Sequence, residues 1–143
     1  MRHALTLAAR ASESGEVPVG ALVVVDGTVV GEGWNQPIAT SDPTAHAEIV
    51  AMRAASRYLR NYRLSGATLV VTVEPCLMCV GAMVHARIGT VVFGALEPRA
   101  GALGSSIAAH ETAGLNHRLT AVGGVLAEEC RAVMQAFFRD RRA

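Results

Sequence analysis

The sequence predicts an α/β protein with three layers, in which a central mixed sheet of about five strands lies between helices. Three observations predict this fold. The chain has 143 residues, the usual size of one domain. Two β-branched runs flank Asp26-Gly27, which is a strong hairpin signal. Short apolar runs then alternate with helical patterns, as strands joined through helices do. We therefore expect one domain over residues 1–143.

The first third of the chain predicts a helix followed by a hairpin. Residues 2–14 place Leu5, Ala8 and Ala9 on one helical face. Strands are expected over residues 19–25 and 28–34, where valine and other β-formers gather. Residues 35–41 are expected to form a loop.

The middle of the chain predicts two helices around a buried strand. Asp42 is expected to be an N-cap and Pro43 the first helical residue, with the helix ending near Tyr58. Residues 68–73 form a continuous apolar run, which suits a strand buried on both faces. Pro75 then helps to start a helix over residues 76–86.

The last third predicts two more strands and a closing helix. Strands are expected over residues 90–94 and 119–125. Residues 98–116 are rich in Gly, Ala and Ser, and are expected to form a loop with a short helix. Residues 127–142 have the spacing of an amphipathic helix.

Composition excludes several classes of protein. Hydrophobic residues make up 51% of the chain and charged residues 17%, which argues against extensive disorder. No apolar run is long enough to span a bilayer, and the first residues lack the apolar stretch of a signal peptide. We therefore expect a cytoplasmic protein that does not contact membranes. The net charge of +1 is unlike that of a strongly basic nucleic-acid-binding domain, so any RNA contact must come from a local patch.

The three cysteines are the first candidates for chemistry. Their odd number argues against a disulfide framework. Cys76 and Cys79 are three positions apart in the first turn of a predicted helix, where both sulfurs can point at one place. The helix N-terminus favours thiolate, the form that binds metal. A redox pair or two small core residues are the alternatives. Cys130 falls in the last helix and is expected to be a buried core residue.

His46 and Glu48 complete the pattern. Alone, His46 could be a capping or solvated side chain, and Glu48 an ordinary first-turn acid. With Cys76 and Cys79, His46 makes a set of three ligands. Three protein ligands are typical of a catalytic zinc site, which keeps a position for water. A carboxylate beside such a metal can accept the proton of the water and pass it to a leaving group, and this is the predicted role of Glu48.

The combination of H-x-E with P-C-x-x-C is a signature of zinc deaminases. The sequence resembles the tRNA-specific adenosine deaminase family, within the cytidine deaminase-like fold. The resemblance covers nearly the whole chain and includes, in order, segments 16–21 (EVPVGA), 31–35 (GEGWN), 42–49 (DPTAHAEI), 74–79 (EPCLMC), 91–95 (VVFGA), 115–117 (LNH) and 137–139 (FFR).

This resemblance implies a function and a set of residues. It implies one Zn²⁺ per chain held by His46, Cys76 and Cys79, with Glu48 as the proton shuttle. Asn35 and the backbone at Ala47 and Cys76 would contact the target nucleoside. The family acts as a homodimer on the wobble adenosine in the anticodon stem-loop of an arginine tRNA. The residues that the resemblance places against RNA are Glu97, Phe138, Arg139, Arg141 and Arg142.

One segment departs from the pattern of the family. Leu96-Glu97-Pro98-Arg99 stands where bacterial members more often have Arg-Asp-x-Lys, so Leu96 cannot make the phosphate contact that an arginine could make there.

The sequence leaves three alternatives open. The first is a deaminase of a free base or nucleoside, of the guanine or cytosine type. The second is a zinc-stabilised RNA-binding module without catalysis, which would leave Glu48 without a task. The third is a thiol redox protein, which would leave both His46 and Glu48 unexplained.

Overall fold

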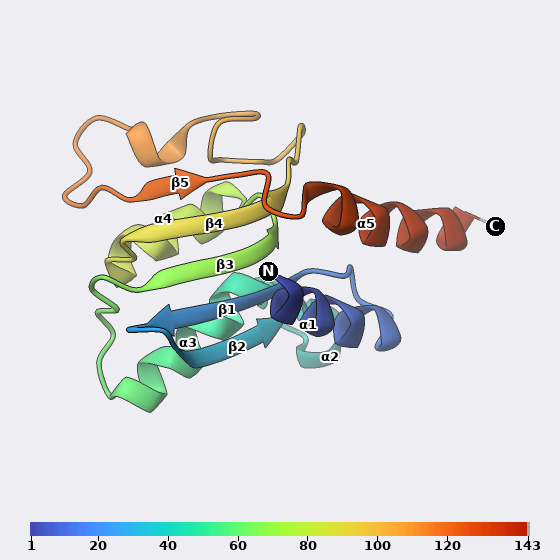
Figure 1. Cartoon of the computed structure of the whole chain (residues 1–143), viewed down its shortest axis with the longest axis horizontal. Helices are drawn as coiled ribbons and strands as arrows, with labels where there is room; N and C mark the ends of the chain where they lie inside the picture. The colour runs from blue at the N-terminus through green and yellow to red at the C-terminus, as the bar shows by residue number, and fades with distance from the viewer. Residues whose placement is uncertain (143) are drawn as a thin grey trace.

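Five strands form the central sheet, in the order β2-β1-β3-β4-β5 (Figure 1). The computed structural model describes residues 1–142. Strand β1 is antiparallel to both β2 and β3, whereas β3, β4 and β5 run parallel, so the sheet is mixed as predicted. The strands are β1 Gly20–Val25, β2 Thr28–Trp34, β3 Thr68–Val73, β4 Thr90–Ala95 and β5 Thr120–Val122.

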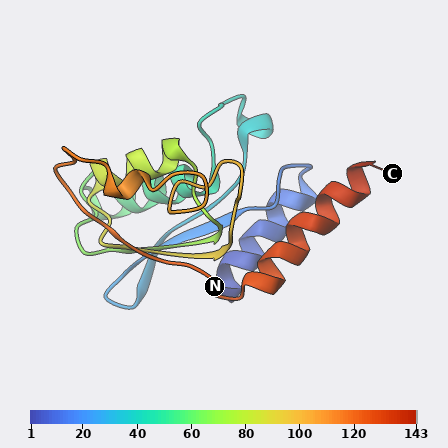
Figure 2. The ribbon, with the colours of Figure 1, turned by 90° about the horizontal axis from the view of Figure 1, so that it is seen from above.

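Helices cover both faces of the sheet (Figure 2). Helices α3 (Ala47–Leu59) and α4 (Leu77–Ala86) lie on one face. Helices α1 (Arg2–Glu13) and α5 (Ala127–Arg142) lie side by side on the other. Two short helices, α2 (Pro37–Thr40) and η1 (Ala109–Glu111), interrupt the loops. Within residues 1–142, no helix is both long and apolar enough to cross a membrane.

The hairpin between β1 and β2 forms as the sequence predicts. Asp26 and Gly27 both have positive φ, of 50° and 76°, which is the geometry of a two-residue turn with the twist that strands require. Strand β2 also lies unusually close to α3, because Gly31 and Gly33 face that helix. A Cβ at either glycine would overlap the backbone of α3. The close packing fixes the start of α3, where His46 and Glu48 lie.

The strand directions bring the predicted functional segments to one edge of the sheet. Strands β3 and β4 end at this edge, as does β2, and β1 begins there because it is antiparallel to β3. Helices α3 and α4 also begin at this edge. Segments that are distant in the sequence therefore meet there, as expected at the carboxyl ends of strands in an open α/β sheet.

Several predicted boundaries were wrong. Helix α3 begins at Ala47 and its N-cap is His46, not Asp42. The reason is local: the Asp42 carboxylate accepts hydrogen bonds from the backbone N–H and the hydroxyl of Thr44, at 2.9 and 2.7 Å, and so closes a separate turn. Cys76 is likewise the N-cap of α4 and not its first helical residue.

The remaining differences lie in the loops and at strand ends. The segment predicted as a loop over residues 35–41 contains helix α2, which starts at Pro37. Strand β5 is shorter than the predicted 119–125, and β1 starts one residue later than predicted. The other elements agree with prediction to within a residue or two, and helix η1 is the short helix expected in the long loop.

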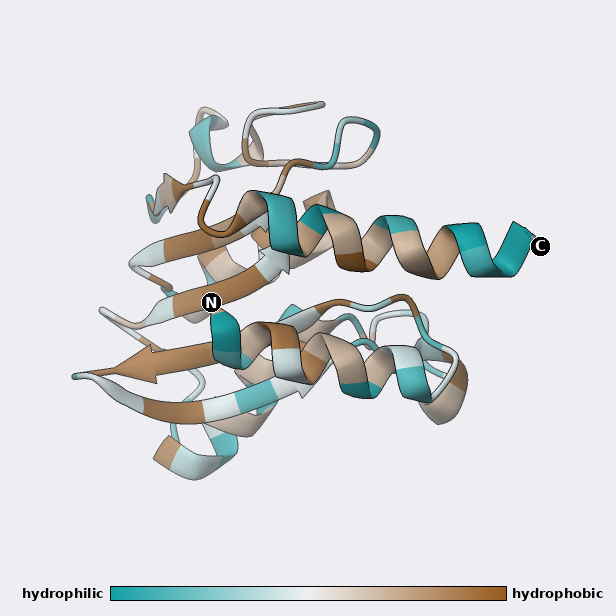
Figure 3. Cartoon of the chain, turned by 45° about the vertical axis from the view of Figure 1, so that its right-hand side comes forward, coloured by the Kyte–Doolittle hydropathy of each residue, from teal (hydrophilic) through white to brown (hydrophobic). Residues whose placement is uncertain are grey.

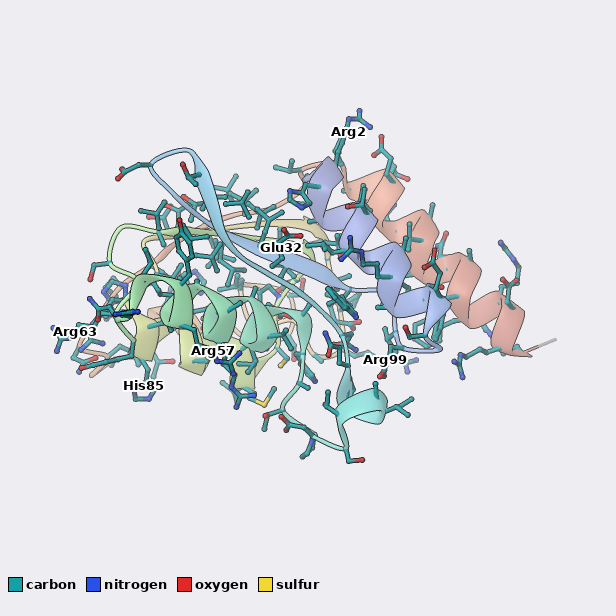
Figure 4. All side chains as sticks on the ribbon, turned by 90° about the horizontal axis from the view of Figure 1, so that it is seen from below. Arg2, Glu32, Arg57, Arg63, His85 and Arg99 are labelled. Carbon is teal, nitrogen blue, oxygen red and sulfur yellow. The ribbon has the colours of Figure 1, made fainter. Side chains whose placement is uncertain are left out.

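Charge is distributed unevenly over the molecule. Residues 49–96 contain five arginines and a single acidic residue, the buried Glu74. We call the exposed part of this region, with Arg53, Arg57, Arg60, Arg63 and His85, the basic face. In Figure 4, the labelled Arg57, Arg63 and His85 lie on the side formed by α3 and α4. Among the described residues, Arg53 is the one member of the basic face that pairs with an acid, Asp42, at 3.3 Å.

Candidate metal centre and its cavity

His46, Cys76 and Cys79 form a cluster at the start of α3 and α4. The Nδ1 atom of His46 lies 3.6 Å from the sulfur of Cys76 and 3.6 Å from that of Cys79. All three ligand atoms lie within 4.8 Å of one another, so one metal ion can reach them all. His46 and Cys76 are the N-caps of their helices, and Cys79 lies in the first turn of α4.

The chemistry of this cluster fits zinc. The hydrogen bond from Cys79 is the main cause that lowers the pKa of Cys76 to about 4, with a further contribution from His46. The same pairing with Cys76, together with burial, raises the pKa of Cys79. A cation bound between the two sulfurs would favour the thiolate form of both. One imidazole and two thiolates, with their helix N-termini facing the cluster, are a donor set that zinc prefers.

Glu48 lies in the first turn of α3, one helical residue beyond Ala47, and only 4% of its surface is exposed. Burial raises the pKa of this carboxyl, although His46 opposes the shift.

Asn35 is also buried and follows directly after β2. Its side chain lines the cavity described below, and among residues 1–142 its amide makes no hydrogen bond to another residue, so the amide is available to a ligand.

A cavity of about 250 Å³ joins these residues. It is lined by His46, Cys76, Glu48 and Asn35, so the structure brings together side chains that the sequence had singled out separately. Its apolar wall comes from Val17, Val19, Val73 and Met134. Ala47 is buried at the start of α3. Its backbone N–H is one of the first four of the helix and has no intrahelical partner.

The cavity continues into a groove between the loop after β4 and helix α5. Glu97 and Met134 line both the cavity and the neighbouring hollow, and Phe138 and Arg142 line that hollow and the next. Arg141 also borders the groove, and donates a hydrogen bond of 2.5 Å to the carbonyl of Gly15. Arg139 is exposed on α5 and does not line the groove. The polar end of α5 is visible in Figure 3.

Two buried carboxylates, one of which lines the cavity, were not predicted from the sequence. Glu16 accepts hydrogen bonds from the backbone N–H groups of Ile38 and Ala39, at 3.2 and 2.8 Å. Glu74 lines the cavity and accepts hydrogen bonds from the loop after β4. Burial raises the pKa of Glu74, but these hydrogen bonds outweigh burial and leave the pKa below its ordinary value. An acid directly after an apolar strand, as Glu74 is, is a signal that could have found it, because a buried charge needs partners.

Comparison with known proteins agrees with this geometry. The profile of the cytidine and deoxycytidylate deaminase zinc-binding region matches residues 1–95, which include His46, Cys76 and Cys79. A tRNA-specific adenosine deaminase of Haemophilus influenzae is 50% identical over 99% of this chain and 83% of its own length. The chain belongs to the tRNA-specific adenosine deaminase family. Zinc is therefore the metal of this deaminase, and the three clustered side chains fit it.

Two solved structures can be compared with the fold of this deaminase. A structure from studies of A-to-I editing by tRNA:A34 deaminases is 38% identical, with a TM-score of 0.91 over 93% of this chain and 96% of the other. A guanine deaminase of Bacillus subtilis is 31% identical, with a TM-score of 0.65 over 96% of this chain and 90% of the other. The fold is thus shared with both, and it agrees more closely with the A34 deaminase.

Proposed function

We propose that this deaminase converts adenosine to inosine at the wobble position of a tRNA anticodon. The observation that carries the proposal is the cavity in which the three-ligand cluster, the buried Glu48 and the unpartnered amide of Asn35 meet. Three protein ligands, with no fourth found in the group among residues 1–142, are the pattern of a catalytic zinc site. The family and the similar A34 deaminase structure support adenosine in tRNA as the substrate.

We propose specific roles for the residues of the cavity. His46, Cys76 and Cys79 hold one zinc ion, which when bound supplies the Lewis acidity that activates water. Glu48 accepts in turn the two protons that the attacking water gives up, and delivers the first to the ring nitrogen and the second to the amino group that leaves as ammonia. The side chain of Asn35 and the backbone at Ala47 and Cys76 hold the base. The reaction consumes water and yields inosine and ammonia.

The groove beside α5 supports an RNA substrate over a free base. A free base needs only the cavity, whereas an anticodon loop extends beyond it on both sides of the flipped nucleotide. Phe138 offers an exposed ring, and Arg142 an exposed cation, along this groove. We propose that Glu97, Phe138, Arg139, Arg141 and Arg142 contact the RNA.

Several finer features stay predictions. We propose that residues 1–143 act as one deaminase domain, in the cytoplasm, on an arginine tRNA.

We also propose a homodimer. An apolar hollow of about 330 Å³ between α3 and α4, lined in part by Ile49, Met52 and Met78, supports it, because such a surface suits a second copy. Sedimentation at micromolar concentration tests the dimer.

One substrate panel tests the proposed function. Zinc-loaded protein is incubated with an anticodon stem-loop that carries adenosine at the wobble position, and in parallel with free adenosine, cytosine and guanine. We expect inosine in the stem-loop and no deamination of the three small molecules. Deamination of free guanine or cytosine at a higher rate would assign the chain to the alternative class of free-base deaminases.

A further inference from the structure

The carboxylate of Glu74 is tied to a single segment of the chain. Glu74 follows β3 and is only 3% exposed. It accepts hydrogen bonds from the backbone N–H groups of Glu97, Leu103 and Ser105, at 3.1, 3.0 and 3.1 Å. It also accepts one from the Ser105 hydroxyl. All four donors lie within residues 97–105, which we call the rim loop. Hydrogen bonds to an ionised acceptor are stronger than neutral ones, so Glu74 is the main anchor of this loop.

The rim loop is shaped to receive this carboxylate. Gly101 lies directly against it, and a Cβ at position 101 would overlap the carboxyl group of Glu74. The loop is closed on itself by a bond of 2.8 Å from the Gly101 N–H to the Glu97 carbonyl. A second bond of 2.8 Å runs from the Ala102 N–H to the carbonyl of Pro75, beside the ligand Cys76. The contacts with Glu74 therefore fix the position of the rim loop.

The rim loop in turn forms the mouth of the cavity. Glu97 lines the cavity and both hollows that continue it along α5. Its carboxylate accepts a hydrogen bond of 2.9 Å from the backbone N–H of Arg99, so Arg99 is positioned by the same loop. A shift of the loop would move both residues. The metal ligands belong to the starts of α3 and α4 and not to the loop, so we expect them to move less.

We propose that Glu74 is a positioning residue that acts through the rim loop to hold Glu97 and Arg99 against the RNA beside the target nucleotide. The identity of this RNA rests on the proposed function. Glu74 presets the loop before RNA arrives, and a preset loop binds more tightly because less order has to be imposed on binding. Loss of the anchor should therefore weaken the binding of RNA, with zinc retained.

The main test uses the full-length, zinc-loaded Glu74→Gln variant. Gln keeps the shape of Glu, but its amide nitrogen cannot accept the hydrogen bonds that one carboxylate oxygen accepts. We expect faster amide exchange in residues 97–105 and unchanged exchange in β3 and α4. We expect the Kd for the anticodon stem-loop, measured by fluorescence anisotropy, to rise on the order of tenfold. The zinc content should stay at one ion per chain.

Glu16→Gln is the matched control. Glu16 is as buried as Glu74 and also accepts hydrogen bonds from backbone N–H groups, but these belong to Ile38 and Ala39 in helix α2. Its substitution should leave the exchange of residues 97–105 unchanged. Faster exchange of the rim loop in both variants would indicate a general loss of stability and would overturn the assignment of the loop to Glu74.

A second variant approaches the same contact from the loop. Gly101→Ala keeps the Glu74 side chain, but its Cβ would overlap both the Glu74 carboxyl group and the backbone carbonyl of Glu97. We therefore expect the rim loop to shift away from Glu74 and the Kd to rise by the same order. Gly81→Ala is its control, because nothing lies within 4 Å of a Cβ at position 81 in α4. If Glu74→Gln does not fold, Gly101→Ala decides the question. A Gly101→Ala protein that binds the stem-loop as tightly as the wild type would overturn the proposal.

The readouts separate this inference from the proposed function. A wild-type protein that binds the stem-loop and forms no inosine would defeat the proposed function, while a raised Kd in Glu74→Gln would still support the role of Glu74. Faster exchange of the rim loop with an unchanged Kd would overturn the role of Glu74 whatever the activity. So would loss of zinc together with a raised Kd, since Glu74 would then support the metal centre itself.

Discussion

Glu48 is a buried acid at the start of a helix, and that position alone has two physical interpretations. An acid in the first turn stabilises a helix through the helix dipole, by about 0.3–1 kcal/mol at an exposed site. An acid beside a metal can instead carry protons during a reaction. The cavity that Glu48 shares with the metal ligands and Asn35 favours the second role.

The Glu48→Gln variant distinguishes the two roles. Gln is nearly isosteric, but it cannot accept a proton at neutral pH. We expect the variant to keep its zinc, because Glu48 is not one of the three clustered ligands. Single-turnover formation of inosine should fall by about ten-thousand-fold, the upper end of the range for general acid–base catalysis, because one group serves several proton transfers. A zinc-loaded variant within a few-fold of the wild-type rate would contradict the proton-carrier role.

Asn35 provides a prediction about the substrate. Its side-chain amide has no protein partner among the described residues, and it faces the cavity from the end of β2. Asn35→Ala should lose a hydrogen bond to the bound base, which costs about 1–3 kcal/mol and lowers kcat/KM by about ten- to a hundred-fold. The zinc content should be unchanged. Full activity of this variant on the stem-loop would show that the base lies elsewhere.

At the residue scale, the metal ligands were easier to predict from the sequence than the buried carboxylates that hold loops and helices in place. His46, Cys76 and Cys79 were predictable because their spacing and residue types are characteristic of zinc sites, and the structure brings them together. Glu16 and Glu74 were not predicted, because their partners are 22 to 31 positions away in the chain. No local pattern announces a hydrogen bond to a backbone N–H so distant in sequence.

At the element scale, helix α5 connects the cavity to the surface. Arg139 and Arg142 are exposed on it, whereas Arg141 bonds to Gly15 and stacks on Phe137 at 4.5 Å. Arg141 therefore also helps to dock α5, so its removal would test two effects together. Arg139 and Arg142 are the better probes of RNA contact.

We expect the Arg139→Ala/Arg142→Ala variant to bind the anticodon stem-loop more weakly. The slope of log K against log salt should become shallower by about one unit for each phosphate that the variant no longer neutralises. Binding titrations between 50 and 200 mM salt, about the range over which such slopes are resolved, measure this. Arg2→Ala/Arg10→Ala removes the same charge from α1 and should leave the slope unchanged. Equal slopes in all three proteins would mean that the end of α5 is only a solvated surface.

Strands and helices differ in how far the sequence determined their limits. The strands were predictable because apolar runs and the Asp26-Gly27 turn mark them directly. The start of α3 was not, because Asp42-Pro43 resembles a helix start and yet its carboxylate is satisfied by Thr44 within a turn. Asp42 can act as a helix N-cap or can close a turn with Thr44. The packing of α3 against β2 decides between these two arrangements.

At the scale of the whole molecule, the metal ties distant parts of the chain together. His46 is 30 residues from Cys76 and 33 from Cys79, and the ligands belong to two different helices. A ligand that binds only the folded state stabilises it by mass action, by about 4 kcal/mol at a thousand times its Kd. Removal of zinc by a chelator should therefore lower the Tm by roughly 10 °C.

Differential scanning fluorimetry with and without chelator measures this effect. Zinc added in excess after chelation should restore the Tm. The Cys79→Ala variant should already have the lower Tm and should not respond to chelator. A wild-type Tm that is insensitive to chelator, in protein shown to have lost its zinc, would contradict the coupling. The mixed sheet, with a hairpin followed by strands joined through helices, was predicted from the sequence. The strand order β2-β1-β3-β4-β5 was not, because it depends on contacts among all five strands.

Because of the basic face described above, positive charge is concentrated on one side of the molecule, although the net charge is only +1. A polyanionic resin responds to the local field of such a surface and not to the average over the molecule. Arg57, Arg60, Arg63 and His85 lie outside the apolar hollow assigned to the dimer. We therefore expect the protein to be retained on heparin at neutral pH, although its pI of about 7.8 suggests weak retention. Arg57→Ala/Arg63→Ala should elute at lower salt than Arg2→Ala/Arg10→Ala, which has the same net charge. For the same reason, cellular nucleic acid is expected to accompany the wild-type protein through purification unless the salt is raised.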